Sequence, residues 1–223
     1  MVEIREIDRK SEWEKWVVSF SEANFLQSWY WGEFHQALGK KVYRRGFFRA
    51  GRMVGSMLVV KETAKRGNYL TVPAGPLIDF GDKQVTALWV KDLKNLCRQE
   101  RCSFVRVRPQ ITETPENARL FSSLGFMRAP FHLHAELTLK LDLAKSNEEL
   151  MAEMRKATRY EIRQAQKLGI KVETSTNPDD MDAFYDLQVK TASRQAFVPF
   201  SRNFLKVQFE KLVSDGKVLL YTA

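Results

Sequence analysis

Cationic side chains gather in one stretch of the sequence. Between positions 155 and 171 there are six lysine or arginine residues and a single acid. Wound at about 100° per residue, this stretch places five of its cations on one arc of a helix: Arg155, Lys156, Arg159, Arg163 and Lys167. Like charges on one helix face repel each other unless an anion binds there, and guanidinium groups donate bidentately to phosphate. The pattern predicts a phosphate-bearing partner; a plain solvated surface is the alternative interpretation.

Arg194 belongs to a second cluster, which reads Thr191-Ala-Ser-Arg194-Gln-Ala-Phe197-Val-Pro-Phe200. It follows a predicted helix and precedes an aromatic loop that contains proline. A guanidinium at this position can reach a ligand bound beside the loop. The alternative is an arginine that caps the helix or lies on the surface.

A third cluster reads Phe25-Leu-Gln27-Ser-Trp-Tyr-Trp31-Gly-Glu-Phe-His35. Its aromatic side chains form either a stacking platform for a ligand or part of the core. His35 lies one turn beyond Trp31 and therefore on the same helix face. No nucleophile accompanies the histidine, and the alternative interpretation of a lone histidine is a structural residue with its hydrogen bonds satisfied.

Common catalytic motifs are missing from the sequence, which contains no GxSxG, HExxH, Walker A or GxGxxG pattern. His132 and His134 share one face of a predicted strand, but no cysteine or carboxylate is placed to complete a metal site. The sequence therefore predicts no metal, and it leaves the catalytic residues unassigned.

The composition is that of a folded protein, because 44% hydrophobic and 28% charged residues exclude disordered and collagen-like chains. The net charge of +9 favours an anionic partner. Cys97 and Cys102 are too few for a disulfide framework, and the N-terminus lacks the apolar core of a signal peptide. The longest apolar run, 57–60, is far below the ~18 residues of a membrane span. We expect a cytoplasmic protein with reduced thiols and no transmembrane segment.

Hydrophobic periodicity predicts a series of helices and strands in the first 145 residues. Ser11 and Glu14 form an expected capping box before the first helix, and Gly51-Arg52 suits a tight hairpin turn. The expected helices span 11–20, 28–38, 85–98 and 115–124, and the expected strands span 41–50, 53–62, 68–72, 103–107 and 131–143. This order is similar to that of the GNAT acyltransferase fold, a mixed α/β (α+β) arrangement.

The pattern changes after residue 145. One long helix is expected over 146–168, with Ser146 and Glu149 as its capping box. A strand, two helices and a strand follow, at 170–174, 178–191, 204–213 and 218–221. Since a second domain of the same type would begin in this way, three parts are expected: a first GNAT-like domain over 1–145, a basic connecting helix over 146–169, and the incomplete start of a second GNAT-like domain over 170–223.

Five segments, taken in order, resemble the FemABX family of peptidyltransferases, which build the interpeptide bridges of peptidoglycan. They are Phe25-Leu-Gln27-Ser with Trp31-Gly-Glu-Phe, Gly75-Pro-Leu-Ile-Asp79, Leu141-Asp-Leu with Glu149-Leu-Met, Met154-Arg-Lys-Ala-Thr-Arg159-Tyr-Glu-Ile-Arg163, and Thr191-Ala-Ser-Arg194-Gln-Ala-Phe197. The resemblance covers essentially the whole chain. It implies twin GNAT-like domains and a length greater than 223 residues, so we expect a C-terminally truncated member.

The resemblance also implies the substrates. The donor is an aminoacyl-tRNA rather than coenzyme A, and the acceptor is a peptidoglycan precursor, either lipid II or a UDP-linked muropeptide. Where GNAT enzymes carry a glycine-rich pyrophosphate loop, this chain reads Pro73-Ala-Gly75-Pro-Leu-Ile-Asp79, in which two prolines remove N–H donors. No cofactor is expected. We do expect a peripheral contact with the inner face of the membrane.

The family contacts its precursor through a cationic residue after the Gln–Trp segment and through an arginine in the T-x-x-R segment. His35, where a lysine is expected, and Arg194 stand at these positions. The predicted substrate-binding residues are His35, Arg194, Trp31, Gln27, Gly75 and Phe197, and the 155–167 cations are expected to meet precursor phosphates or tRNA. A coenzyme A-dependent N-acetyltransferase and a non-catalytic module that binds RNA or precursor are the alternative functions.

Overall fold

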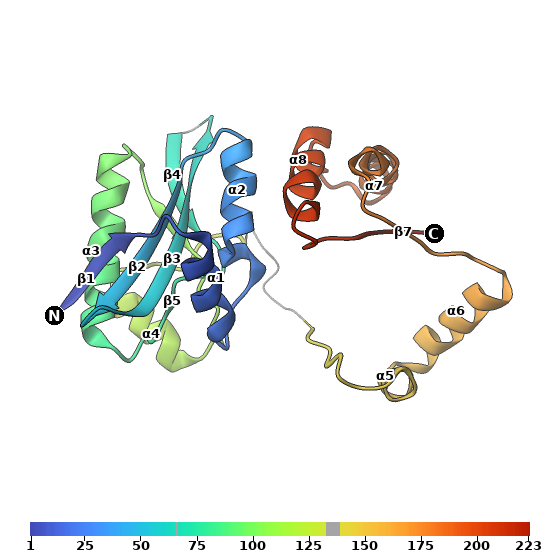
Figure 1. Ribbon diagram of the computed structural model, residues 1–223, viewed down its shortest axis with the longest axis horizontal. Coiled ribbons are helices and arrows are strands. Elements are labelled where there is room, and N and C mark those ends of the chain that lie inside the picture. The colour runs from blue at the N-terminus through green and yellow to red at the C-terminus, as the bar shows by residue number, and fades with distance from the viewer. Residues whose placement is uncertain (66, 133–138) are drawn as a thin grey trace.

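A six-stranded mixed sheet forms the centre of the N-terminal part in the computed structural model, which describes residues 1–65, 67–132 and 139–223 (Figure 1). The strand order is β1-β2-β3-β4-β6, and β5 pairs with β3. Only the β4–β6 pair is parallel among the described pairings of this sheet. The strands are β1 (Val2–Glu6), β2 (Val42–Arg49), β3 (Arg52–Ala64), β4 (Gly67–Val72), β5 (Leu77–Ile78) and β6 (Val105–Val107).

Helices cover both faces of this sheet because β3 is apolar on both sides. Successive side chains of a strand point to opposite faces. Leu58 and Val60 pack against α1 (Lys10–Ser19) and α2 (Trp29–Ala37), whereas Met57 and Val59 pack against α3 (Lys83–Gln99). The helix α4 (Pro115–Ser123) adds its Phe121 to the α3 side.

The predicted helices and strands up to residue 124 are confirmed apart from their ends, but two local details were wrong. Arg9 is the N-cap of α1, without a side-chain hydrogen bond, so the expected Ser11–Glu14 capping box does not form. Glu14 instead accepts the backbone N–H of Trp29 at 2.6 Å. The β2–β3 turn consists of Ala50 and Gly51, one residue earlier than expected, and both have positive φ, as a tight right-twisted hairpin requires. The short strands β1 and β5 and the 3₁₀-helix η1 (Phe25–Gln27) were not predicted.

The predicted long helix over 146–168 is wrong, because two helices occupy this stretch: α5 (Asn147–Glu153) and α6 (Lys156–Lys167). The Ser146–Glu149 capping box forms as expected. Met154 and Arg155 are extended, with ψ of 151° and 149°. Arg159 donates to the carbonyl oxygens of Ala152 and Met154, at 3.0 and 2.8 Å. Its guanidinium thereby satisfies carbonyls that helix continuation would have bonded.

The C-terminal segment packs against the first part through α8. After α6 come β7 (Glu173–Ser175), η2 (Pro178–Asp180), α7 (Met181–Gln195), α8 (Arg202–Val213) and β8 (Leu220–Thr222), and β7 pairs with β8. Phe204 of α8 meets Phe34 of α2 edge-on, with 5.0 Å between ring centroids. Lys10 of α1 pairs with Asp215 at 3.2 Å. In Figure 1, α8 lies between α2 and α7, while α5 and α6 project away.

The expected strand over 131–143 falls partly on residues 133–138, which lie outside the described residues, as does His134. Residues 139–143 form no strand. Among the described residues, no helix has both the length and the apolar character needed to cross a membrane.

Candidate functional site

Gln27 is fully buried and links three segments of the first domain. Its amide nitrogen donates to the Pro73 carbonyl at 2.5 Å, and its amide oxygen accepts the Leu58 N–H at 2.9 Å. Leu58 lies between the part of β3 that pairs with β4, from Val60 onward, and the part that pairs with β5, up to Ser56. The Gln27 amide thus takes the place of a strand partner at a gap in the sheet.

Gly75 lies against that amide. A Cβ atom at Gly75 would come within 2.6 Å of the Gln27 amide carbon, so only glycine permits this approach. The structure therefore brings the predicted residues Gln27 and Gly75 together, but as buried neighbours. The loop that carries Gly75 uses its Pro73 carbonyl internally, and its two prolines offer no N–H donors.

Trp31 and His35 also lie in the interior of the first domain. Only 7% of Trp31 and 6% of His35 is exposed. The His35 ring packs against Trp31 and Phe34, with centroid distances of 5.0 and 4.8 Å. Trp31 also meets the exposed Phe25 edge-on at 5.5 Å. The core interpretation therefore holds for Trp31, and a His35–phosphate contact needs a rearrangement that exposes the imidazole.

Arg44 is a buried cation next to this cluster that the sequence analysis did not single out. It is 5% exposed, its guanidinium lies 3.8 Å from the Trp29 ring centroid, and it donates to the Trp29 carbonyl at 3.1 Å. Burial lowers the pKa of Arg44, while nearby carboxylates, first Glu33, oppose this effect. Gly32 makes room for the guanidinium, since a Cβ there would lie 2.8 Å from its central carbon. The sequence signal for this contact was Gly32 itself, because a glycine inside a predicted helix indicates that another group approaches the backbone closely. The arginine fixes the start of α2, the helix that carries Trp31 and His35.

Arg194 and Phe197 lie at the exposed C-terminal end of α7. The helix ends at Ala196, whose φ of 55° turns the chain and lets the Phe197 N–H bond the Ala192 carbonyl at 3.2 Å. Phe197 is 44% exposed. Within the described ranges, Arg194 makes no ion pair, so its guanidinium is available to a ligand.

The cations of the 155–167 stretch lie mainly on the exposed surface of α6. Arg155, Lys156, Arg163 and Lys167 are exposed, whereas Arg159 is half-buried by its contacts with α5. A depression of about 670 Å³ lies between the two helices, lined by Asn147, Glu148, Met151, Ala152, Arg159 and Arg163. This surface is open, and it presents charge without a nucleophile.

The predicted site residues form three groups. Gln27 and Gly75 lie beside each other, with Gln27 just before α2, while Trp31 and His35 belong to α2 itself. Arg194 and Phe197 lie at the C-terminal end of α7, and the basic side chains lie on α6. The structure unites the first group and keeps the other two apart from it. Among the described residues, no cluster of histidine, cysteine and carboxylate side chains could hold a metal ion.

Comparison with known proteins assigns the chain to a family. The FemAB family model matches residues 9–124 and 125–215. The chain belongs to the FemAB family. The lipid II:glycine glycyltransferases of two Staphylococcus epidermidis strains are each 22% identical to this FemAB chain over 219 residues, covering 93% of the chain and 52% of the relative.

A solved structure agrees with the fold. The crystal structure of FemX superposes with a TM-score of 0.78 at 20% sequence identity, covering 96% of this chain and 56% of FemX. The predicted mixed α/β (α+β) fold class is confirmed. The chain spans about half the length of the curated relatives it matches. The boundaries at 145 and 169 stay a prediction.

Proposed function

We propose that this FemAB chain acts in non-ribosomal aminoacyl transfer, moving an amino acid from an aminoacyl-tRNA to a stem-peptide amine of a peptidoglycan precursor. The family match over both halves of the chain carries this proposal. Support for the acceptor comes from the relatives named as lipid II:glycine glycyltransferases.

The donor side is supported by the buried loop between β4 and β5. Coenzyme A-dependent transferases need free backbone N–H groups where this loop runs, because such groups cradle the pyrophosphate. Here the loop contains Pro73 and Pro76, and the Gln27 amide occupies the space beside Gly75. A donor such as aminoacyl-tRNA carries a large polyanion that the protein can bind directly. Such a donor does not require this cradle.

The reaction needs no covalent enzyme intermediate. The amine nitrogen attacks the ester carbonyl of the aminoacyl-tRNA, an amide bond forms, the ester C–O bond breaks, and the amine proton passes to the departing ribose oxygen. An amine and an activated ester react downhill, so holding the two substrates together can supply roughly 7–11 kcal/mol of the barrier reduction. Support for the developing oxyanion adds to this.

Arg194 is the proposed contact for the acceptor phosphates. It is exposed, lies at a helix end beside the aromatic 197–200 segment, and carries a fork that matches phosphate oxygens. Phe197 offers an apolar surface beside it. Trp31, Gln27 and Gly75 stabilise the fold around this site. His35 contacts the acceptor only in a conformation that exposes its imidazole.

The exposed α6 cations are the proposed contact for a polyanion, either the precursor phosphates or the tRNA backbone. A filter-binding assay with charged tRNA tests this, comparing the wild type with the triple variant R155Q/R163Q/K167Q. We leave Arg159 unchanged because it holds α5. Retention at the wild-type level would remove tRNA from this surface.

Transfer itself is tested by supplying charged tRNA and lipid II, or a UDP-linked muropeptide, and detecting the new amide by mass spectrometry. Arg194→Gln is expected to lower transfer at least tenfold, and Arg194→Lys is expected to lower it less. Saturable binding of coenzyme A in calorimetry, with acetyl transfer in place of aminoacyl transfer, would refute the proposal.

A further inference from the structure

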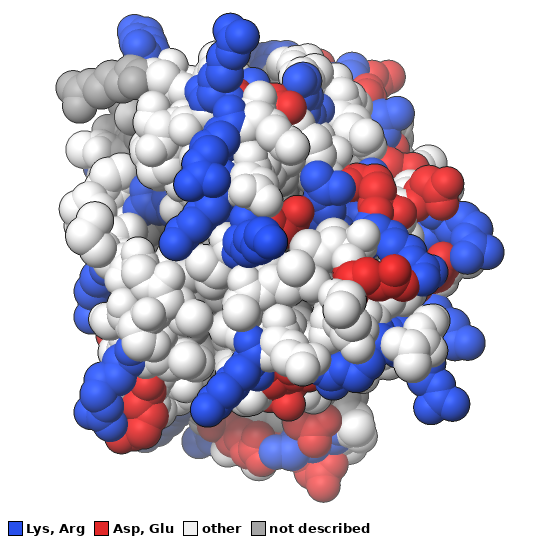
Figure 2. Space-filling model, turned by 90° about the vertical axis from the view of Figure 1, so that its left-hand side faces the viewer, with Lys and Arg blue, Asp and Glu red and all other residues white. Residues whose placement is uncertain are grey.

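The outer face of α3 carries a row of cations that the proposed function does not yet use. The inner face of this helix packs Val85, Trp89 and Leu93 into the core. Its exposed residues follow a helical spacing of three or four, and the charged ones among them define the α3 basic strip: Lys83, Lys91, Lys94 and Arg98. Figure 2 views the molecule from the side of α3 and shows blue side chains in a column there, with the red acidic ones mostly toward the right and lower edges.

The charge of the strip is not neutralised by the protein. Among the described residues, no carboxylate forms an ion pair with Lys83, Lys91 or Lys94, and Arg98 donates only to the Asn95 amide, at 3.4 Å. The two acidic residues of α3 and its N-cap pair with arginines outside the strip. Asp92 of α3 is oriented to Arg45 at 3.5 Å, and Asp82 binds Arg49 at 2.7 Å.

This arrangement contrasts with other cations of the same domain. Arg45 pairs with Glu6 at 2.7 Å, and Lys61 pairs with Glu100 at 2.9 Å. Like charges three and four residues apart destabilise a helix unless a counter-charge is bound. A row of unpaired cations on one otherwise well-packed helix therefore indicates an external anion.

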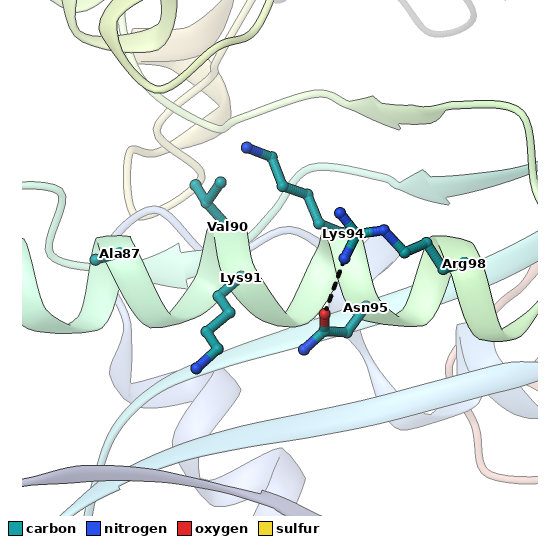
Figure 3. A pocket seen from close by; sticks show the side chains of 6 residues that line it. All are labelled: Ala87, Val90, Lys91, Lys94, Asn95 and Arg98. Carbon is teal, nitrogen blue, oxygen red and sulfur yellow. Dashed lines mark hydrogen bonds between the residues drawn. The ribbon is translucent and has the colours of Figure 1, made fainter.

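The elongated shape of this surface favours an extended anion over a small one. A shallow depression of about 400 Å³ follows the helix, lined by Ala87, Val90, Lys91, Lys94, Asn95 and Arg98 (Figure 3). Lys91 and Lys94 extend to its two sides, and Arg98 turns back toward Asn95. At about 1.5 Å per residue, the strip spans about 22 Å from Lys83 to Arg98. The cations do not converge on one point, so a single small phosphate cannot use them all.

The surface is also too polar for insertion into a membrane. Interfacial helices present large apolar side chains beside their cations. None of the exposed large hydrophobic side chains of the described residues belongs to α3, where only Ala87 and Val90 lie between the cations.

We infer that the α3 basic strip binds the phosphate backbone of the RNA donor. The inference rests on the proposed function, which supplies the RNA, and it adds a docking surface on the first domain that is separate from α6. In Figure 1, α3 and α6 lie at opposite sides of the molecule, so a donor that contacts both must be a large polyanion. Recognition by this strip depends on charge and is independent of base sequence.

The test measures the affinity of the full chain for a tRNA transcript by fluorescence anisotropy at several KCl concentrations. The strip variant is K91Q/K94Q/R98Q. The matched control is K15Q/K65Q/K211Q, which removes the same charge from exposed positions elsewhere. Since each phosphate contact contributes about 0.7–0.9 to the slope of log Kd against log salt, the strip variant is expected to lose about 2–3 from that slope and at least tenfold in affinity. The affinity of the control variant is expected to stay within about twofold of the wild type. The charges that the control removes contribute only to the long-range attraction of the RNA, which changes little.

Four outcomes are distinguishable. Weaker binding with a reduced slope in the strip variant alone supports the inference. Tight wild-type binding with an unchanged strip variant overturns it and leaves the proposed function standing. No tRNA binding by the wild type overturns both. Loss of sedimentation with phosphatidylglycerol vesicles, at unchanged tRNA affinity, overturns it and assigns the strip to a membrane.

Discussion

Gln27 is the residue on which the local geometry of the first domain depends most directly. One amide group bonds the Leu58 N–H and the Pro73 carbonyl in a fully buried position. The adjacent Gly75 is required because no side chain fits against that amide. Family resemblance led us to expect substrate contact here, and the structure shows both residues buried in the scaffold that shapes the loop.

Replacing Gln27 by leucine is expected to lower the free energy of unfolding by about 2–4 kcal/mol. The new side chain fills the volume but leaves buried backbone groups without partners, each at a cost of about 1–3 kcal/mol. Urea denaturation followed by fluorescence measures the change. Gln166→Leu on exposed α6 serves as the control and should shift stability by less than about 0.5 kcal/mol. Equal stability of the Gln27 variant and the wild type would contradict the assignment.

Glu100 predicts a pH dependence of stability. Hydrogen bonds from Tyr43, Lys61 and Lys41 lower its pKa to about 2, and its side chain is only 14% exposed. The unfolded-state pKa is higher, about 4.3, so the ionised carboxylate stabilises the fold above that pH. This stabilisation, at most about 3 kcal/mol, is lost as the pH falls from about 5 to 2.

The variant Glu100→Gln should therefore be less stable than the wild type at pH 7, and the difference should shrink toward pH 2. Thermal unfolding between pH 7 and pH 2.5 measures it. Glu22→Gln, at an exposed position, should leave the pH profile unchanged. A constant gap between Glu100→Gln and the wild type over the whole range would count against this account.

At the scale of elements, the break between α5 and α6 sets the direction in which the α6 cations project. The sequence has no glycine or proline at the break, so nothing in the residue types forces it. Arg159 holds the break by donating to two carbonyls at the end of α5. A cation predicted to bind phosphate thus has a structural role at a helix end, where cations are favourable.

Arg159→Gln is expected to loosen α5. The loss of two charged hydrogen bonds at a half-buried site should cost about 1–2 kcal/mol. Hydrogen exchange of the α5 amides should accelerate roughly 5- to 30-fold, following that free energy at 1.4 kcal/mol per factor of ten. Arg163→Gln, which lines the same depression but makes no such bonds among the described residues, is the control. Equal exchange in both variants would show that Arg159 does not hold α5.

On the scale of the whole molecule, contact between α8 and α2 joins the C-terminal segment to the first domain. Phe204 is stacked on Phe200 at 4.7 Å and meets Phe34 edge-on at 5.0 Å. The Lys10–Asp215 pair lies at the same junction. This junction sets the position of α7, and with it Arg194, relative to the first domain.

Phe204→Ala is expected to weaken this junction by about 2 kcal/mol, below the 3–5 kcal/mol of a fully buried phenylalanine, because Phe204 is half-buried. Limited proteolysis should then cleave within α8 several times faster, since docking no longer protects this helix. Phe184→Ala, on the exposed side of α7, is the control. Unchanged protection would show that the junction does not depend on this ring.

Much of the first domain followed from sequence patterns. Hydrophobic periodicity predicted the strand over 53–62 and the helix over 85–98, which form as β3 and α3. The cap at Ser28 and the stop at Gly39 set the ends of α2. These features depend on neighbours within a few residues, so periodicity and capping describe them.

The roles of individual residues depended on distant partners. Gln27 joins two segments because Pro73 and Leu58 lie beside it. The end of α5 depends on Arg159, which lies six residues beyond the last residue of α5 and one turn into the next helix. The outward row of α3 was visible as spacing, yet its lack of counter-charge depended on where Asp92 and Asp82 turn. By itself, the sequence determined the elements, the mixed fold and the family resemblance, because local periodicity and motif order are encoded along the chain. Only the tertiary structure decided which polar groups are buried and which charges face water, because those depend on contacts between segments far apart in sequence.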